Sequence, residues 1–364
     1  MIKLGICMIA VFLSVIWRKN KWLFRFLFLL MFLMAAGDLT SPDKDAYISY
    51  YETIRSINIH EDVEIGFQAL MVFAQTIGLN FSQFIFVYVG ICFCMLYRLF
   101  DRLSDNKAMA LSLYMLFPYI LDADQLRSYL GQLIILMGIV KLVQSKKPNV
   151  IKYLCYVLVA MLFQESCAIF VIYLLVLLDK KKVRKYILIL SGLLLAGRYL
   201  IPVLASRLTA FNLRKVADYF TNTAGKSTWI IYALFYLAVI LMTLYYGSQG
   251  RLTARKRLDD MIDHGDISLF EGAGNDVLLK VNMISIALIT LIPINPHFER
   301  LLRPVLMLDY ITLTNMVGNR LRYKHEYVIV GSLLILCLGR FATYLLGGGW
   351  ESYIEPLFFH GSII

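Results

Sequence analysis

Charged residues are scarce in this chain. Asp, Glu, Lys and Arg make up only 17% of its 364 residues, whereas soluble globular domains carry about 25%. Hydrophobic residues make up 59%, compared with roughly 45–50% in soluble domains. This combination excludes a disordered chain and an ordinary cytosolic enzyme, and it indicates a polytopic membrane protein.

Several patterns that carry chemistry are also missing. The six cysteines form no Cys-x-x-Cys pair and have no metal-ligand spacing with histidine, which favours a role as small apolar side chains. His-Glu-x-x-His and Gly-x-Ser-x-Gly do not occur. Residues 224–228 resemble the end of a phosphate-binding loop, but Phe220 stands where its first glycine is required. We therefore expect no cofactor and no metal.

Apolar segments follow one another along the chain. A bilayer core of about 30 Å needs about 20 apolar residues in a helix, fewer in a short or re-entrant segment. Segment 66–79 is ambiguous and could be a half-helix or an interfacial helix. The sequence predicts an all-α polytopic protein of about 12 transmembrane helices plus short re-entrant or interfacial helices, forming a single integral membrane domain over 1–364. The candidate spans are 4–16, 22–37, 81–97, 108–121, 129–145, 150–163, 167–178, 185–204, 229–246, 277–294, 304–317 and 326–345.

The distribution of basic residues predicts the orientation. The net charge of +11 would suggest nucleic acid in a soluble protein, but here Lys and Arg lie mostly in short gaps between apolar runs, as topology signals do. Two thirds of the 36 Lys and Arg residues fall in one alternating set of gaps, which the positive-inside rule places in the cytoplasm. This predicts that loop 247–280 is cytoplasmic and that outer loop 38–65 carries an interfacial helix. We expect no nucleic-acid partner.

The segments 150–163 and 167–178 are each too short for a comfortable span. Gln164, Glu165 and Ser166 separate them, and basic residues flank the pair at both ends. This arrangement predicts a tight helical hairpin whose polar tip lies at or below the outer surface.

Polar chemistry gathers on the predicted outer side. Asp43, Tyr47 and Tyr51 recur at a spacing of four residues after Pro42, which would place them on one face of a helix that begins at the proline. They could form a tyrosine belt at the membrane interface. They could equally provide a carboxylate for acid–base chemistry beside aromatic platforms for sugar rings. A one-sided arrangement is typical of an enzyme at that interface, whereas a transporter places polar groups at mid-depth.

Arg127 would lie in the first turn of a helix, just after Asp122 and Asp124. It could pair locally with either aspartate, or its guanidinium could bind phosphate oxygens, which it suits by geometry.

A second basic group lies late in the chain. Arg300 and Arg303 are three residues apart, so both could face one anion such as a diphosphate, or they could contact lipid headgroups. The nearby His297 could act as a base or be an ordinary surface residue.

Five stretches in their order along the chain resemble the EpsG-type family of Wzy-like polysaccharide polymerases. They are SPDKDAYISYYETI, EIGFQAL, LRSYLGQLIILMGI, the hairpin VLVAMLFQESCAIFVIYLL and FERLLRP, and the length and hydropathy resemble the family over nearly the whole chain. One departure lies at the hairpin tip, which commonly reads Phe-His-x-Ser in such proteins. Here Gln164 occupies the histidine position, so Glu165 would have to act as the base, or the base lies elsewhere.

The resemblance implies a GT-C-like membrane glycosyltransferase. Such a protein would join oligosaccharide repeat units carried on undecaprenyl diphosphate into O-antigen, capsule or exopolysaccharide, at the outer face of the bacterial cytoplasmic membrane. Transfer would be metal-independent and inverting. Expected partners are the lipid-linked oligosaccharide, membrane lipid, a flippase and a chain-length regulator.

The reaction that the resemblance implies assigns roles to the polar residues of the predicted outer side. The candidates for the base, in order, are Asp43, Glu165 and His297. The substrate-binding candidates are Arg127, Arg300, Arg303, Tyr47, Tyr51 and Gln164.

Two other functions compete with polymerisation. A flippase for lipid-linked oligosaccharide would explain the membrane class and the arginines, but it would need charges throughout a central cavity. The second competitor is another transferase or ligase that works at the outer face with a polyprenyl-linked donor. The sequence hardly distinguishes such an enzyme from a polymerase.

Overall fold

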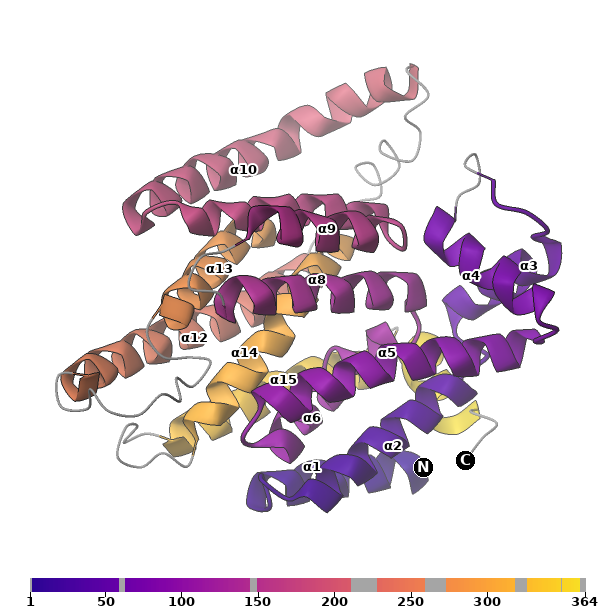
Figure 1. The fold of residues 1–364 in the computed structure, drawn as a ribbon, viewed down its shortest axis with the longest axis horizontal. Coiled ribbons are helices and arrows are strands. Elements are labelled where there is room, and N and C mark those ends of the chain that lie inside the picture. The colour runs from indigo at the N-terminus through magenta and orange to yellow at the C-terminus, as the bar shows by residue number, and fades with distance from the viewer. Residues whose placement is uncertain are drawn as a thin grey trace. The chain divides into compact units, whose positions relative to one another are not determined.

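A computed structural model of the chain describes residues 2–58, 63–144, 149–210, 228–258, 273–317, 326–347 and 349–360. These residues form helices joined by short connections, and no strand occurs among them (Figure 1). The all-α prediction is therefore confirmed. Two predicted features fall partly outside the described residues: positions 259–272 of the cytoplasmic loop and positions 224–227 of the segment that resembles a phosphate loop.

The helices, in chain order, are α1 (Ile2–Ile16), α2 (Lys21–Gly37), α3 (Pro42–Thr53), α4 (Ile65–Thr76), α5 (Phe81–Leu103), α6 (Lys107–Leu116), α7 (Tyr119–Asp122), α8 (Leu126–Gln144), α9 (Val150–Met161), η1 (Glu165–Leu177), α10 (Lys180–Ala210), α12 (Thr228–Leu258), α13 (Ala273–Ile289), η2 (Pro296–Leu302), α14 (Arg303–Met316), α15 (Glu326–Leu346), η3 (Trp350–Ile354) and η4 (Pro356–His360). Here η1 and η2 are 3₁₀ helices, while η3 and η4 are π-helices.

Local sequence explains several helix starts. Asn20 accepts hydrogen bonds from the first backbone amides of α2, and Asn80 forms a reciprocal capping box with Gln83 at the start of α5. These side chains satisfy amides that have no partner inside the helix. Pro42 occupies the first turn of α3 as predicted, since its fixed φ suits that position.

Every predicted apolar segment contains a helix, but fewer helices are long enough to span a bilayer. Among the described residues, four helices meet the length and hydropathy of a span, within Phe81–Leu103, Leu126–Gln144, Trp229–Ser248 and Glu326–Leu346. A fifth span results if α2 and α3, bent by 59° at their junction, count as one. Several other apolar helices have only 10–17 residues, below the roughly 20 that a simple crossing needs. The predicted number of about 12 transmembrane helices is therefore not confirmed.

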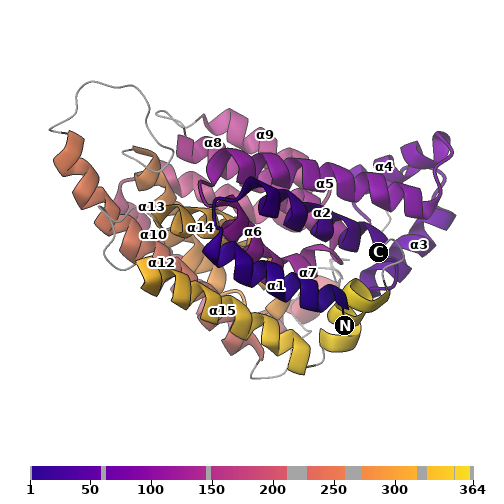
Figure 2. The same ribbon diagram turned by 90° about the horizontal axis from the view of Figure 1, so that it is seen from below.

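The described chain divides into two compact units. The first comprises 1–138, 154–168 and 310–364, and the second comprises 139–153 and 169–309. In the first unit α6 is central, because α1, α2, α5 and α15 all contact it (Figure 2). Every residue of α6 from Ala108 to Leu116 is buried, as expected of a helix that is apolar on all sides.

In the second unit α13 is central, with α10 and α12 packed against it. Its buried side chains include Leu278, Val281, Ile284 and Leu288. The Tyr173 hydroxyl of η1 shares a hydrogen bond of 2.9 Å with Ser285 of α13, so the second arm of the hairpin is attached to this core.

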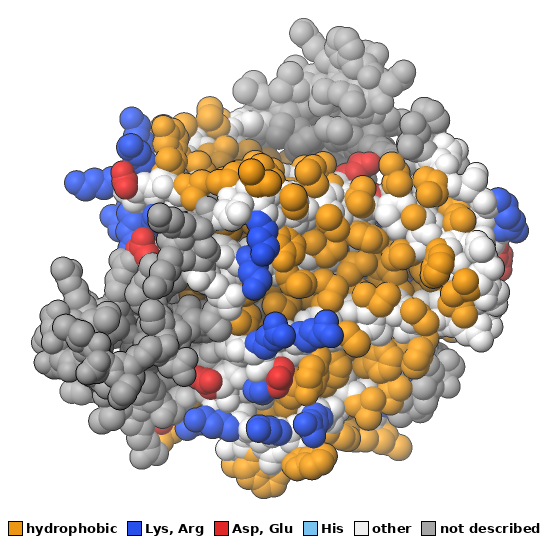
Figure 3. All heavy atoms as spheres, viewed as in Figure 1, with side chains coloured by type: hydrophobic (Ala, Val, Ile, Leu, Met, Phe, Trp, Pro, Cys, Tyr) orange, Lys and Arg blue, Asp and Glu red, His pale blue; other side chains and the backbone are white. Residues whose placement is uncertain are grey.

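Many large apolar side chains face outward. Trp22, Leu188 and Ile335 are 76%, 74% and 73% exposed. Hydrophobic side chains cover much of the surface visible in Figure 3, while Lys and Arg gather in smaller groups. A soluble monomer rarely exposes such large apolar areas, so this surface supports a membrane protein.

Candidate functional site

The junction between α2 and α3 is fixed by buried polar contacts. Asp38 accepts hydrogen bonds from the backbone amides of Thr40 and Ser41, at 3.1 and 3.2 Å. The Lys44 side chain is fully buried, and its Nζ donates to the carbonyl oxygen of Asp38 at 3.2 Å. These bonds compensate for removing a lysine from water. They set the direction in which α3 leaves α2.

Asp43 and Asp124 lie together at the N-terminus of α3. The backbone amide of Asp43 donates to Asp124 Oδ1 at 3.1 Å, so Asp124, in the turn before α8, caps a helix 81 residues away in sequence. A carboxylate is favourable near a helix N-terminus. Burial, and then the neighbouring Asp43, raise the pKa of Asp124 from its usual 3.8 to about 7. Asp124 is therefore protonated more readily than a solvated carboxyl group.

Arg127, Glu64 and Tyr47 form the charged centre of the first unit. Arg127 Nη1 lies 2.5 Å from Glu64 Oε2, and the two side chains are 26% and 9% exposed. The Arg127 guanidinium also lies over the Tyr47 ring, 5.7 Å from its centroid. A carboxylate partner and an aromatic face both lower the cost of burying a guanidinium. The arrangement holds Arg127 in place and leaves part of it exposed.

The tip of the predicted hairpin contacts Glu64 of the charged centre. The backbone amide of Gly66 donates to the carbonyl of Leu162 at 2.7 Å, and the amide of Glu165 lies 3.4 Å from Glu64 Oε1. A Cβ atom at Gly131 of α8 would lie 3.2 Å from the Cβ of Gln164. The tip of the predicted hairpin, which joins α9 to η1, therefore packs against α4 and α8.

The structure places the other predicted residues of this unit as follows. Glu165 is exposed and Gln164 is buried. Tyr51 packs away from the charged centre, because its hydroxyl donates to the Leu79 carbonyl at 2.6 Å and its ring stacks on Phe84. The unit thus brings Asp43, Tyr47 and Arg127 into one neighbourhood with the hairpin tip, while Tyr51 contacts the start of α5.

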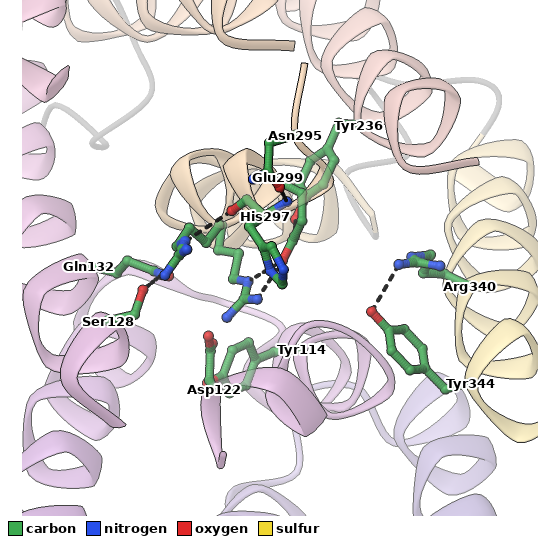
Figure 4. A network of polar contacts seen from close by, with 12 residues as sticks. Tyr114, Asp122, Ser128, Gln132, Tyr236, Asn295, His297, Glu299, Arg340 and Tyr344 are labelled. Atoms are coloured by element: carbon green, nitrogen blue, oxygen red, sulfur yellow. Dashed lines mark hydrogen bonds and ion pairs between the residues drawn. The ribbon is translucent and has the colours of Figure 1, made fainter. Parts of the chain in front are cut away.

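The second unit has its own buried ion pair. Glu299 and Arg303 are salt-bridged with side chains only 5% and 1% exposed, and Arg303 Nε donates to Glu299 Oε1 at 3.1 Å. The Tyr236 hydroxyl donates to Glu299 Oε2 at 2.6 Å (Figure 4). Arg303 is therefore engaged by a carboxylate, unlike the outward-facing diphosphate ligand that its sequence spacing suggested.

His297 and Arg300 lie in η2 of the same unit. His297 is exposed, and its backbone amide donates to Asn295 Oδ1 at 2.9 Å (Figure 4). Arg300 Nε donates to the His297 carbonyl at 3.0 Å. Because Arg300 is partly exposed and Arg303 is buried, the two arginines occupy different environments.

Sequence reasoning missed Glu64 and the pairing of Asp43 with Asp124. Glu64 stands directly before an apolar segment, as Arg127 stands in the first turn of α8, so a charge at the edge of an apolar run was the available signal. The sequence also contains Asp-x-Asp twice, at 43–45 and 122–124, and the structure joins one member of each. No group of three His, Cys, Asp or Glu side chains that could hold a metal occurs among the described residues.

The all-helical fold, the apolar surface and the candidate spans define an integral membrane protein with a polar, partly buried site. The model of the EpsG family matches residues 21–355, which is nearly the whole chain, and the chain belongs to the EpsG family. This family is of the Wzy-like polymerase type, so the chain is a polysaccharide polymerase-like membrane protein. No curated protein and no solved structure matches it.

Proposed function

We propose that the chain polymerises oligosaccharide repeat units carried on undecaprenyl diphosphate, at the outer face of the bacterial cytoplasmic membrane. The observation that carries this proposal is the charged centre of Arg127, Glu64 and Tyr47, which three of the five family-like stretches build together and which the hairpin tip contacts. A membrane polymerase must bind an anionic lipid carrier and activate a sugar hydroxyl. The first unit offers a cation and carboxylates close together for these two tasks.

Arg127 is the proposed ligand of the donor diphosphate. Its guanidinium presents several donors in a fixed fork that matches phosphate oxygens. Glu64 and Tyr47 hold this fork in one orientation, so the diphosphate meets a cation that needs little reorganisation. Neutralising the diphosphate makes it a better leaving group. Glu64 acts here as a positioning residue, because both of its oxygens already have partners.

Asp43 is the proposed base that removes the proton from the acceptor hydroxyl. It lies partly exposed in the first turn of α3, whereas Asp124 beside it is only 2% exposed. A base in reach of the hydroxyl contributes about 10²–10⁴-fold in rate. Attack on the anomeric carbon opposite the leaving diphosphate would invert that centre. The buried Arg303–Glu299 pair suits a structural role better than direct contact with the diphosphate.

Deletion of the gene, followed by gel analysis of surface glycan, tests the proposal. Loss of a polymerase leaves single repeat units attached at the surface, whereas loss of a ligase leaves polymer unattached. Loss of a flippase removes both. We expect single repeat units in the deletion strain.

Complementation with Asp43→Asn then tests the base. This variant should accumulate normally in the membrane yet fail to restore long glycan, because the amide keeps the shape and removes the basic oxygen. Asp45→Asn is the matched control, since Asp45 is an exposed carboxylate in the same first turn of α3. Long glycan at normal abundance in the Asp43→Asn strain would assign the base to another residue.

A further inference from the structure

The second unit contains a buried carboxyl group that belongs neither to the charged centre nor to the Glu299–Arg303 pair. Asp309 of α14 and Asn282 of α13 are both 0% exposed. Asn282 Nδ2 donates to Asp309 Oδ1 at 2.9 Å. The remaining oxygens of the two side chains, Asn282 Oδ1 and Asp309 Oδ2, have no hydrogen-bond partner among the described residues. Two buried acceptors are thus unsatisfied within one side-chain pair.

The charged and titratable groups on the surrounding helices bond elsewhere. Tyr173 of η1 shares its hydrogen bond with Ser285. Lys280 of α13 pairs with Asp276, and Arg303 of α14 pairs with Glu299, which also binds Tyr236 of α12. Within the described part of the chain, no Lys, Arg or His lies within ion-pair distance of Asp309. An ionised carboxylate in this position would carry a desolvation cost that no counter-charge offsets.

The hydroxyl groups nearby do not remove this cost. Thr243 of α12 is fully buried and within hydrogen-bond reach of Asp309, but its single hydroxyl proton is donated to the Val239 carbonyl of its own helix at 3.1 Å. Ser285 donates to the Val281 carbonyl at 2.9 Å. With both hydroxyl protons used in this way, a proton on the carboxyl group itself would supply the missing donor.

We propose that Asp309 and Asn282 form a buried proton-binding site. Asp309 Oδ2 would carry one proton and donate a hydrogen bond through it to Asn282 Oδ1. Asn282 Nδ2 would at the same time donate to Asp309 Oδ1. A carboxylic acid and an amide paired in this way satisfy each other with two hydrogen bonds. A single proton removes both unsatisfied acceptors and the buried charge. A hard cation such as Ca²⁺ or Mg²⁺ binds about six oxygens or more, and only two unsatisfied oxygens are present here.

The site makes the packing of α13 against α14 depend on pH. The folded chain holds this proton more tightly than the unfolded chain, in which the carboxyl group is solvated. Stability contributed by the site is therefore present at low pH and is lost as the pH rises and the proton leaves. Unlike the polymerase proposal, this inference needs no substrate and no activity.

Infrared spectroscopy of the purified full chain in detergent tests the proposal. The wild-type protein at neutral pH should show a protonated-carboxyl C=O band that Asp309→Asn lacks. Asp276→Asn is the matched control: its side chain lies on α13 and is 30% exposed, and this variant should keep the band. If Asp309→Asn does not accumulate, Asn282→Ala is the second variant, and its band should shift because the acid has lost its acceptor.

Hydrogen exchange gives an independent readout. Amides of α13 and α14 should lose protection in the wild type as the pH rises, once the faster intrinsic exchange is corrected for, and Asp309→Asn should not show this loss. Absence of an Asp309-dependent band in the wild type would overturn the proposal. So would stabilisation of the wild type, but not of Asp309→Asn, by Na⁺ at fixed pH, which would identify a cation site instead.

Discussion

Arg127 shows how a membrane protein keeps a charge largely out of water. Its helix begins one residue earlier, Tyr47 reaches it from α3, and Glu64 reaches it from the start of α4. The sequence predicted a cation with a special role at this position, because a charge at the end of an apolar helix is costly unless it is paired or functional. It did not identify Glu64, which lies 63 residues away, because single-sequence periodicity contains no information on such long-range pairs.

We expect Arg127→Lys to impair polymerisation even though it keeps the charge. Lysine presents a point charge and cannot reproduce the fork that binds two phosphate oxygens. A charge-assisted hydrogen bond contributes about 1.5–3 kcal/mol, which corresponds to a loss of about 10–100-fold in rate. Glycan chain length and the rate of incorporation of labelled repeat units measure the effect.

Arg55→Lys is the control for this substitution. Arg55 is an exposed arginine that follows α3, and its Nη1 bonds the carbonyl of its neighbour Ile54 at 2.8 Å. Its replacement should leave polymerisation unchanged. Equal polymer from both lysine variants would place the diphosphate away from Arg127.

The predicted residues differ in how far sequence alone could place them. The helix over Pro42–Thr53 followed from Pro42 and the spacing of Asp43, Tyr47 and Tyr51. The role of Tyr51 as a sugar platform is not supported by its contacts, because its hydroxyl and ring are both engaged within the protein. A period of four residues gives the face of a helix, but it does not say what covers that face.

At the scale of elements, close packing of α4 on the hairpin depends on Gly66. A Cβ atom there would lie 2.7 Å from the Leu162 carbonyl oxygen and 2.9 Å from the Leu162 Cβ. Neither atom is the end of a flexible side chain, so the backbones would have to separate. That movement would also lengthen the hydrogen bond from the Gly66 amide to the Leu162 carbonyl.

Gly66→Ala should therefore destabilise the protein by about 1–3 kcal/mol, as overpacking of a close contact commonly does. Thermal unfolding of the purified chain in detergent, followed by circular dichroism, measures the change. Gly192→Ala in α10 is the control, since a Cβ atom at Gly192 meets nothing within 4 Å and alanine favours a helix more than glycine. Unchanged unfolding of Gly66→Ala would mean that α4 and the hairpin do not pack closely.

The helices themselves were largely predictable, because apolar runs bounded by Asn, Pro and polar gaps mark their ends. The number of membrane spans was not predictable from the sequence. The sequence prediction counted the apolar runs at 108–121 and 150–163 as crossings, whereas α6 and α9 are short helices of 10 and 12 residues. In α6 nearly every side chain is covered by protein, so its apolar composition reflects burial in the core of its unit.

At the scale of the whole molecule, the chain matches the EpsG family over residues 21–355. This membership is the observation that connects the individual contacts with polysaccharide polymerisation. Composition alone indicated a membrane protein, and the exposed apolar side chains agree with this. The charge asymmetry predicts which loops face the cytoplasm. Neither feature separates a polymerase from a flippase or a ligase, because all three need the same lipid carrier and the same membrane.

Reconstitution of the purified full chain in vesicles with a synthetic lipid-linked repeat unit tests the proposed polymerase function most directly. Products are separated by the number of repeat units they contain. We expect a ladder of longer lipid-linked products with release of polyprenyl diphosphate, and loss of the ladder in Asp43→Asn. Unchanged single repeat units, together with movement of the labelled lipid across the bilayer, would contradict the polymerase and identify a flippase.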